Sequence, residues 1–472
     1  MLYNAYEVQR SLLAGASRLA DMGAGWMANP VNPLSYSSMG EVVAAGLNVF
    51  AHASAPRGKP EFGLTTVEVA GDAAEVVEEV VLRKPFGQLK HFRKVDAHGT
   101  AITGQPRLLI VAPMSGHYAT LLRGTVERML PGHDVFITDW RDAKLVPVAE
   151  GSFDLDDYID YLIEYLTVVK GDNKARPHLL AVCQPSVPAL AATALMSAAK
   201  HPARPATLTM MGGPIDTRQA PTAVNLLATQ RPLSWFEDNV VATVPYLYPG
   251  GGRRVYPGFL QLAGFMTMNL GDHLNSHWEM FKHLVAGDEE SADASRDFYD
   301  EYRSVCDMDA AFYLQTIEAV FQRHLLPKGE LLHRGNRVDP AAIRDTALLA
   351  IEGERDDISG LGQTRAALDL ASKLPASKKQ YYMAREVGHY GIFNGRKWRE
   401  MIAPVVEAHI RAAETKCAIA SESVFKPGGI PRQLGKRSRA KSRRRAGEDR
   451  PTTGRWHRPC RSTAWLCHDA EP

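Results

Sequence analysis

The sequence predicts an α/β protein with a mostly parallel sheet, helices on both faces and a helical insertion that forms a cap. The first observation is that short apolar runs alternate with segments of helical period over residues 101–216 and 341–415. The second is that this alternation stops over residues 217–340, which are rich in Met, His and aromatic side chains. Strands that alternate with helices at this spacing favour right-handed βαβ units and a parallel sheet.

Residues 1–100 are predicted to extend the core with helices and strands. An opening helix is followed by the Pro-rich turn "NPVNPLSYSS" and by a second helix near residues 38–52. The segment "TTVEVAGDAAEVVEEVVLRKPFGQLKHFRK" mixes β-branched with charged residues, and this mixture predicts one or two strands.

The core is predicted in two halves, residues 101–216 and 341–415, on either side of the helical insertion at residues 217–340. Its strands are expected to be continuous apolar runs, because a strand buried on both faces has no polar alternation. The predicted strands are "RLLIVAPM", "HDVFITDW", "PHLLAVC", "ATLTMMGGPID", "ALLAIEGERDDIS" and "KKQYYMAREVGHYG", and the predicted helices are "SGHYATLLRGTVERML", "LDDYIDYLIEYLTVV", "VPALAATALMSAA", "GQTRAALDLASKL" and "RKWREMIAPVVEAHIRAAE".

Composition excludes several classes of protein. The 472 residues are 45% hydrophobic with a formal net charge of +2, which argues against a protein that binds nucleic acid. No window approaches the roughly 18 uninterrupted apolar residues of a membrane span, and the N-terminus lacks the pattern of a secretory signal. Five scattered cysteines argue against a disulfide framework and favour a reducing cytoplasm. Residues 416–472 contain "KRSRAKSRRR" and are predicted to be a disordered basic tail.

A cysteine stands where a buried strand meets a helix, in "LLAVCQPSVPAL" at residues 179–190. In α/β-hydrolases the nucleophile occupies a strained strand-to-helix turn written G-x-S-x-G, in which small residues flank the nucleophile. The matching string here runs from Ala181 to Pro185 around Cys183, and proline is tolerated in the first turn of a helix. An inert cysteine that ends a core strand is the alternative interpretation of this string alone.

Two later motifs follow in the order that an α/β-hydrolase requires, which is nucleophile, acid and then histidine. Asp356 and Asp357 end one predicted strand, and His389 ends the next. All of these residues fall at the carboxyl ends of strands, where an open parallel sheet places its active site. We expect Asp356 to be the acid and Asp357 to be a helix cap or turn residue, with Asp216 a weaker candidate for the acid. The fold class is therefore predicted to be α/β-hydrolase-like.

Each residue of this set has a chemical role. A free thiol with a pKa near ~8.5 is mostly protonated at neutral pH, so His389 is expected to take the proton of Cys183. Asp356 is expected to bind the other imidazole nitrogen and to stabilise the imidazolium. The backbone N–H groups of Gln184 and Met114 are expected to form the oxyanion hole.

Two further motifs are weaker candidates for a functional site. His273 and His277 are four residues apart and could share a helical face as metal ligands, but no third ligand follows at a convincing spacing, so no metal site is predicted. The Gly-rich stretch Gly250–Arg254 lacks the Gly-Lys-Ser/Thr ending of a phosphate loop and is expected to be a flexible lid segment. The exposed aromatic residues of the insertion are expected in the loop Tyr246–Tyr256.

Several stretches together resemble the intracellular polyhydroxyalkanoate depolymerases. They are "MLYNAYEVQR", "VAPMSGHYATLLRGTVERMLPGHDVFITDWRDA", "LAVCQPSVPAL", "IEGERDDISGLGQT" and "REVGHYGIFNGRKWR", and the resemblance covers roughly residues 1–413. It implies an α/β-hydrolase-like enzyme of the bacterial cytoplasm that mobilises stored poly(3-hydroxybutyrate). By this resemblance Cys183 is the nucleophile, and Asp356 and His389 complete the catalytic set.

The same resemblance implies that the enzyme acts on amorphous polymer at the granule surface. It implies no bound cofactor, and coenzyme A is a possible co-substrate because some members of the family are associated with thiolysis. Whether this chain hydrolyses or thiolyses the polymer stays open. The hydrophobic insertion makes a homodimer plausible.

Two other functions compete with this interpretation. A polyhydroxyalkanoate synthase-like acyltransferase also uses Cys, Asp and His on this fold, but we expect glycines beside its cysteine rather than Ala-Val-Cys-Gln-Pro. A non-catalytic granule-surface protein would keep the fold with an unreactive Cys183.

Overall fold

A sheet of nine strands forms the centre of the structure, in the order β1-β2-β3-β5-β4-β6-β7-β13-β14. The computed structural model describes residues 2–268, 282 and 299–424. Strands β5, β4, β6, β7, β13 and β14 are parallel, whereas β1, β2 and β3 add an antiparallel edge. The strands are β1 Thr66–Val69, β2 Asp72–Lys84, β3 Gly87–Val95, β4 Arg107–Val111, β5 Asp134–Trp140, β6 His178–Val182, β7 Thr207–Met211, β13 Ala347–Gly353 and β14 Lys379–Ala384.

Helices cover both faces of this sheet because the direction of the crossovers reverses at β4. The chain passes from β4 through α3 (Arg123–Met129) to β5 on one side, and then through α4 (Leu155–Lys170) to β6 on the other side. Helix α5 (Ser186–Ala198) continues in the second direction to β7. Since such crossovers are right-handed, α3 lies on one face and α4 and α5 lie on the other. The predicted fold class is confirmed.

The antiparallel edge contains three strands where the sequence predicted one or two. The extra break lies at Ala70 and Gly71, which have φ angles of 55° and 97° and join β1 to β2 in a tight hairpin. A two-residue turn with both φ angles positive matches the twist of the flanking strands. Alanine rarely adopts this conformation, so the sequence carried no clear turn signal at this point.

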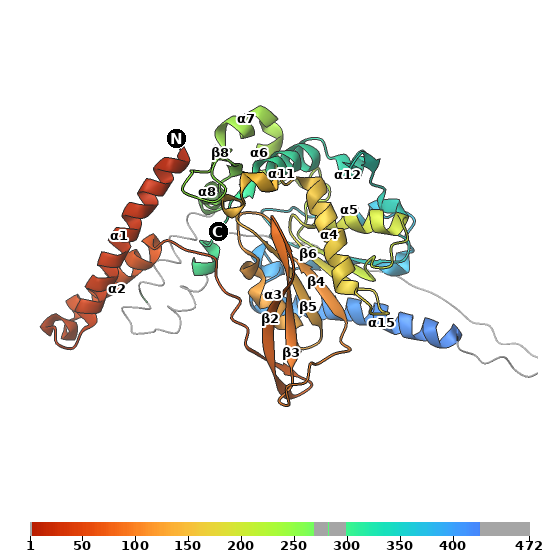
Figure 1. Cartoon of the computed structure of the whole chain (residues 1–472), viewed down its shortest axis with the longest axis horizontal. Helices are drawn as coiled ribbons and strands as arrows, with labels where there is room; N and C mark the ends of the chain where they lie inside the picture. The colour runs from red at the N-terminus through yellow and green to blue at the C-terminus, as the bar shows by residue number, and fades with distance from the viewer. Residues whose placement is uncertain (1, 269–281, 283–298, 425–472) are drawn as a thin grey trace, which may run out of the picture. The chain divides into compact units, whose positions relative to one another are not determined.

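The predicted N-terminal helices are α1 (Leu2–Ala28) and α2 (Ser38–Ser54), which run antiparallel to each other (Figure 1). The Ser17 hydroxyl donates to the Ala51 carbonyl at 2.8 Å. A Cβ atom on Gly23 would lie 3.1 Å from the Leu47 side chain. Small residues between the two helices therefore allow a close approach.

The insertion of residues 217–340 interrupts the chain between β7 and β13, which are neighbours in the sheet. Its helices α6, α7, α8 and α11 gather together in Figure 1. The insertion also contains two small sheets, which the helical pattern of the sequence did not predict. Its elements are α6 Ala223–Gln230, α7 Leu233–Asn239, β8 Ala242–Thr243, β9 Arg254–Tyr256, α8 Gly258–Met268, β10 Met308–Asp309, α11 Ala310–Thr316, α12 Leu325–Lys328, β11 Leu332–His333 and β12 Asn336–Arg337.

The expectation that Gly250–Arg254 forms a flexible lid is wrong, because this stretch is held by buried contacts. The Arg253 guanidinium is buried and pairs with Asp309 at 2.7 Å. It also donates to the carbonyls of Val146 at 3.0 Å and Pro147 at 2.7 Å. A buried ion pair whose remaining donors are satisfied fixes its segment strongly, since breaking it would leave a buried charge alone.

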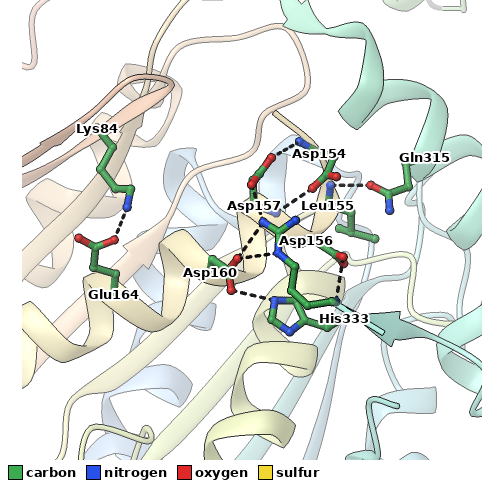
Figure 2. Close-up of polar contacts among 10 residues, drawn as sticks. Lys84, Asp154, Leu155, Asp156, Asp157, Asp160, Glu164, Gln315 and His333 are labelled. Carbon is green, nitrogen blue, oxygen red and sulfur yellow. Dashed lines mark hydrogen bonds and ion pairs between the residues drawn. The ribbon is translucent and has the colours of Figure 1, made fainter. Parts of the chain in front are cut away.

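Helix α4 begins with a capping box and binds the insertion through its acidic face, as Figure 2 shows. The Asp154 side chain accepts from the Asp157 N–H at 2.8 Å, and the Asp157 side chain accepts from the Asp154 N–H at 2.9 Å. From the β11–β12 hairpin, Arg334 contacts Asp157 at 2.5 Å and His333 contacts Asp160 at 2.8 Å. These contacts hold the end of the insertion against the core.

Two boundaries near the C-terminus differ from the prediction. The helix expected at "GQTRAALDLASKL" is reduced to α13 (Ala366–Leu370), because Gly362 has a φ of 95° that an α-helix cannot contain. Helix α15 (Ala403–Val424) continues beyond residue 416, where we expected the disordered tail to begin. Its sequence there is free of Gly and Pro and contains the helix formers Ala, Glu and Lys. Residues 425–472 lie outside the described residues.

None of the helices in the described part of the chain is long and apolar enough to cross a membrane.

Candidate active site

Cys183 occupies the sharp turn between β6 and α5, with a φ of 66°. Its N–H donates to the Met211 carbonyl at 2.7 Å, and its own carbonyl accepts from the Ser186 N–H at 3.0 Å. A left-handed conformation costs a residue with a side chain about 1–2 kcal/mol. The two hydrogen bonds hold the turn in this strained form, which is the geometry of a nucleophile elbow.

Two glycines at the end of β7 make room for the elbow. A Cβ atom on Gly213 would lie 2.2 Å from the side chain of Ser186, at the start of α5. Gly212 has a φ of 59°, and a Cβ atom there would lie 3.1 Å from the His389 ring. The sequence analysis did not single out these glycines, although a Gly-Gly pair directly after a core strand is a readable signal of close backbone approach.

His389 and Asp356 meet beside this turn. The Asp356 Oδ2 atom lies 2.8 Å from the His389 Nδ1 atom, and both side chains are buried. The other carboxylate oxygen of Asp356 accepts from the N–H groups of Ile358 at 2.9 Å and Ser359 at 2.7 Å. The Asp356 carboxylate is thereby fixed in position, and it fixes the orientation of the imidazole in turn.

The charge of His389 depends on its two partners. Burial by itself lowers the pKa of His389, but the negative charges of Cys183 and Asp356, together with hydrogen bonds to both, raise its pKa well above the ordinary value. The structure therefore brings Cys183, Asp356 and His389 together, with the imidazole hydrogen-bonded to both of the other side chains.

This arrangement predicts that alkylation of Cys183 depends on His389. At neutral pH, iodoacetamide is expected to modify Cys183 faster in the wild type than in His389→Asn, because asparagine cannot take the proton of the thiol. Mass spectrometry of the peptide that contains Cys183 measures the rate without interference from the other cysteines.

The matched control for this experiment is His98→Asn, because His98 is exposed and lies outside the site. Its rate of alkylation is expected to equal that of the wild type. Equal rates in the wild type and in His389→Asn would show that the imidazole does not govern the thiol.

The N–H groups of Gln184 and Met114 are available for an oxyanion. Both residues line the same cavity as Cys183. Among the described residues, neither of these two N–H groups donates a hydrogen bond to another protein atom. An oxyanion hole requires free donors beside the nucleophile, and the assignment of Gln184 and Met114 to it stays a prediction.

The alternative residues of the sequence analysis take other positions. Asp216 pairs with Arg218 at 2.7 Å rather than with a histidine. His273 and His277 lie outside the described residues. No group of three or more His, Cys, Asp or Glu side chains that could hold a metal ion is found in residues 2–268, 282 and 299–424.

A cavity of about 410 Å³ opens at Cys183 and His389. Tyr256 from the predicted aromatic loop lines it, whereas Tyr246 of the same loop is 89% exposed. Most of the lining comes from apolar side chains, and many of them belong to the insertion. The insertion contributes Ala223, Val224, Leu227, Ala228, Phe236, Tyr256, Met308, Tyr313, Ile317 and Phe321.

Three polar atoms in the cavity lining have no hydrogen-bond partner among the described residues. They are the Gln184 Oε1 atom, the Thr316 hydroxyl and the Ser359 hydroxyl, all of which are shielded from solvent. An unpaired buried polar group costs free energy, so these three atoms favour a hydrogen-bonding partner within the cavity. The sequence analysis missed Thr316 and Ser359, because single hydroxyl residues carry no recognisable pattern.

Another cavity, of about 380 Å³, lies near the amino ends of β7 and β13. Its lining includes Arg176, Asp345 and Lys378. Ligands of open α/β sheets bind at the carboxyl ends of the strands, so the cavity at Cys183 is the better candidate for the active site.

Comparisons with known proteins support the same region. Residues 212–414 match the family model described as "PHB de-polymerase C-terminus", and this stretch contains Asp356 and His389. The comparison with curated proteins returned no match.

Several solved structures are similar to this chain, at low identity. A thermophilic esterase from Thermogutta terrifontis is 14% identical with a TM-score of 0.37, and the match covers 74% of this chain and 97% of that one. A monoacylglycerol lipase from Paleococcus ferrophilus is 11% identical with a TM-score of 0.38, over 65% of this chain and 96% of that one. These values are too low to carry an argument, so the fold assignment rests on the order and direction of the strands.

Proposed function

We propose that this chain is an ester hydrolase of the poly(3-hydroxybutyrate) (PHB) depolymerase family, and that it cleaves amorphous storage polymer through an acyl-enzyme on Cys183. The match of residues 212–414 to the family model supports this proposal. The proposed substrate is polymer stored in intracellular granules. The enzyme would therefore be cytoplasmic and bound to the granule surface. The observation that carries the proposal is the buried His389–Asp356 pair beside the strained Cys183, at the mouth of an apolar cavity.

The first half of the proposed reaction forms a thioester. The Cys183 thiolate attacks an ester carbonyl carbon, and the negative charge on the carbonyl oxygen is stabilised by the N–H groups of Gln184 and Met114. When the tetrahedral intermediate collapses, the C–O bond breaks and the His389 imidazolium gives its proton to the leaving alkoxide. The products are an acyl-enzyme and a polymer fragment with a free hydroxyl end.

The second half releases the acyl group. Neutral His389 takes a proton from water or from the thiol of coenzyme A. The oxygen or sulfur atom that loses this proton attacks the thioester carbon and expels the Cys183 thiolate. Water yields a carboxylic acid, and coenzyme A yields a 3-hydroxyacyl thioester. In both cases Asp356 holds the imidazolium that forms. No bound cofactor takes part in either half.

The cavity lining supports a polyester substrate. An aliphatic polyester has apolar methyl and methylene groups, interrupted by ester groups that accept hydrogen bonds. Apolar side chains of the insertion match the first kind of group, and the unpaired hydroxyls of Thr316 and Ser359 can donate to the second.

Product release from amorphous PHB granules tests this function. The wild type is expected to release 3-hydroxybutyrate or its oligomers by hydrolysis, or 3-hydroxybutyryl-CoA when coenzyme A is present, and chromatography of the supernatant separates the two outcomes. A second arm supplies 3-hydroxybutyryl-CoA without polymer. Polymer formation in this arm, with no release in the first, would establish a synthase instead. Absence of any turnover while the protein binds granules would establish a non-catalytic surface protein.

A further inference from the structure

Exposed apolar side chains are concentrated on the N-terminal hairpin of α1 and α2. Residues 2–54 carry more exposed large apolar side chains than all the other described residues together. They include Trp26, which is 58% exposed, and Tyr36, which is 76% exposed. Exposed apolar side chains that are concentrated on one pair of helices indicate an interaction site.

On α1 these side chains form a regular stripe. Val8, Leu12, Leu19, Met22 and Trp26 are between 58% and 71% exposed. With the exposed Gly15 included, the steps along the stripe are four, three, four, three and four residues. The residues of α1 that are buried, such as Tyr3, Ser17 and Ala24, are offset from this stripe.

Helix α2 carries a second stripe with the same step. Met39 is 70% exposed, Val43 is 37% exposed and Phe50 is 47% exposed, and the exposed Gly46 lies between the last two. The steps here are four, three and four residues. We refer to the two stripes together as the hairpin seam.

The spacing of the seam indicates a helical partner. Alternating steps of three and four residues give the narrow a/d seam of a coiled coil, whereas a helix that lies on a broad surface needs a wider apolar stripe. Polar residues flank the α1 stripe at Gln9, Ser11 and Arg18, which are all exposed. The stripe is therefore too narrow for a flat partner.

The glycines of the seam also indicate close helix packing. A Cβ atom on Gly15 or Gly46 would meet nothing within 4 Å, so neither glycine is required by the fold of one chain. Glycine in the middle of a helix costs about 1 kcal/mol relative to alanine. A partner helix that approaches at these two points explains why small residues stand there.

The charge and the area of the seam favour a second copy of this chain as the partner. The seam contains no charged residue, and none occurs anywhere between Asp21 and Glu41, so two copies would not repel each other there. The eight large side chains of the seam, at roughly 100 Å² each, offer about 800 Å² per chain. One partner contributes about this area to a standard specific interface.

We propose that two copies of this chain associate through their hairpin seams, so that α1 and α2 of each copy form a four-helix bundle. Such an interface is isologous, because the same surface of both copies forms it. The body of each chain is tied to its hairpin by the hydrogen bond of His52 with Asp300 at 2.7 Å and by the hydrogen bond of Tyr3 with Asp307 at 2.5 Å. This inference does not depend on the proposed activity, and it moves the expected dimer interface from the insertion to the hairpin.

Light scattering during size-exclusion chromatography of the full chain tests the proposal. The wild type at about 10 μM is expected to have twice the mass of one chain, because a specific interface of this size binds at or below micromolar concentration. The double variant Leu12→Asp and Leu19→Asp places four charges in the interface and is expected to weaken association at least about 100-fold. The matched control is Leu247→Asp with Leu332→Asp, which changes two exposed leucines outside α1 and α2. This control is expected to remain a dimer.

Circular dichroism and hydrolysis of a short soluble ester are measured on all three proteins, so that loss of association is separated from unfolding. A monomeric wild type would overturn the proposal, and so would a seam variant that stays dimeric. A monomeric wild type that binds PHB granules or neutral lipid vesicles through Leu12 and Leu19 would assign the seam to an apolar surface instead.

Discussion

Cys183→Ala is expected to reduce the release of products from amorphous PHB by about 10⁴-fold or more. Alanine removes the sulfur atom on which the proposed mechanism forms the acyl-enzyme. Initial rates with granules, and separately with a short soluble ester, measure the effect. The soluble substrate matters because it removes polymer binding from the comparison.

The control for this variant is Cys306→Ala, which removes the other thiol that the structure describes. Cys306 is buried, and its thiol lies 3.6 Å from the His117 carbonyl, away from the His389–Asp356 pair. Its replacement is expected to leave the rate within a few-fold of the wild type. Equal rates for Cys183→Ala and the wild type would contradict the proposed mechanism.

A second variant at position 183 separates strain from chemistry. Cys183→Gly is expected to be as inactive as Cys183→Ala, but more stable than it by about 1 kcal/mol in free energy of unfolding. Glycine accepts the φ of 66° without strain, whereas alanine does not. Denaturant unfolding of the two variants gives the difference.

Gly213→Ala is expected to have the second largest effect. The added methyl group would lie 2.2 Å from the Ser186 side chain and 3.0 Å from the Cys183 carbonyl, so α5 or β7 must shift. Overpacking of this kind costs about 1–3 kcal/mol in free energy of unfolding. A displaced elbow also moves the thiol relative to His389, and a displacement of 1 Å can reduce the rate about 10²-fold.

The cause of this effect is tested with a second substitution. Ser186→Gly removes the atoms that the new methyl group meets, so the double variant is expected to recover part of the stability and activity. The matched control is Gly132→Ala, because a Cβ atom on Gly132 meets nothing within 4 Å. Independent effects of Gly213→Ala and Ser186→Gly would contradict the contact between them.

Much of the fold could be predicted from the sequence, because its central strands have an unambiguous pattern. The runs at β4, β6, β7 and β13 are continuous and apolar, and they are almost fully buried. The small sheets of the insertion could not be predicted in this way. Strands of two or three residues, such as β8 and β9, are too short to show a period.

The candidate site also has a part that the sequence could predict and a part that it could not. Cys183, Asp356 and His389 follow predictable strands, so their order along the chain was enough to bring them together. The surroundings of Asp356 depend on backbone N–H groups at Ile358 and Ser359, which no side-chain pattern announces. The roles of Gly212 and Gly213 depend on distances between strands that are remote in sequence.

The position of the insertion has a consequence for the order of folding. Neighbouring strands β7 and β13 are separated in sequence by residues 217–340. Pairing these two strands therefore requires the ends of a long chain segment to meet, which costs conformational entropy. Strands β4, β5 and β6 and the Cys183 turn can associate earlier, from more local contacts. Asp356 and His389 arrive only with β13 and β14. The set of side chains that the proposed mechanism requires is therefore complete only after β13 and β14 have joined the sheet.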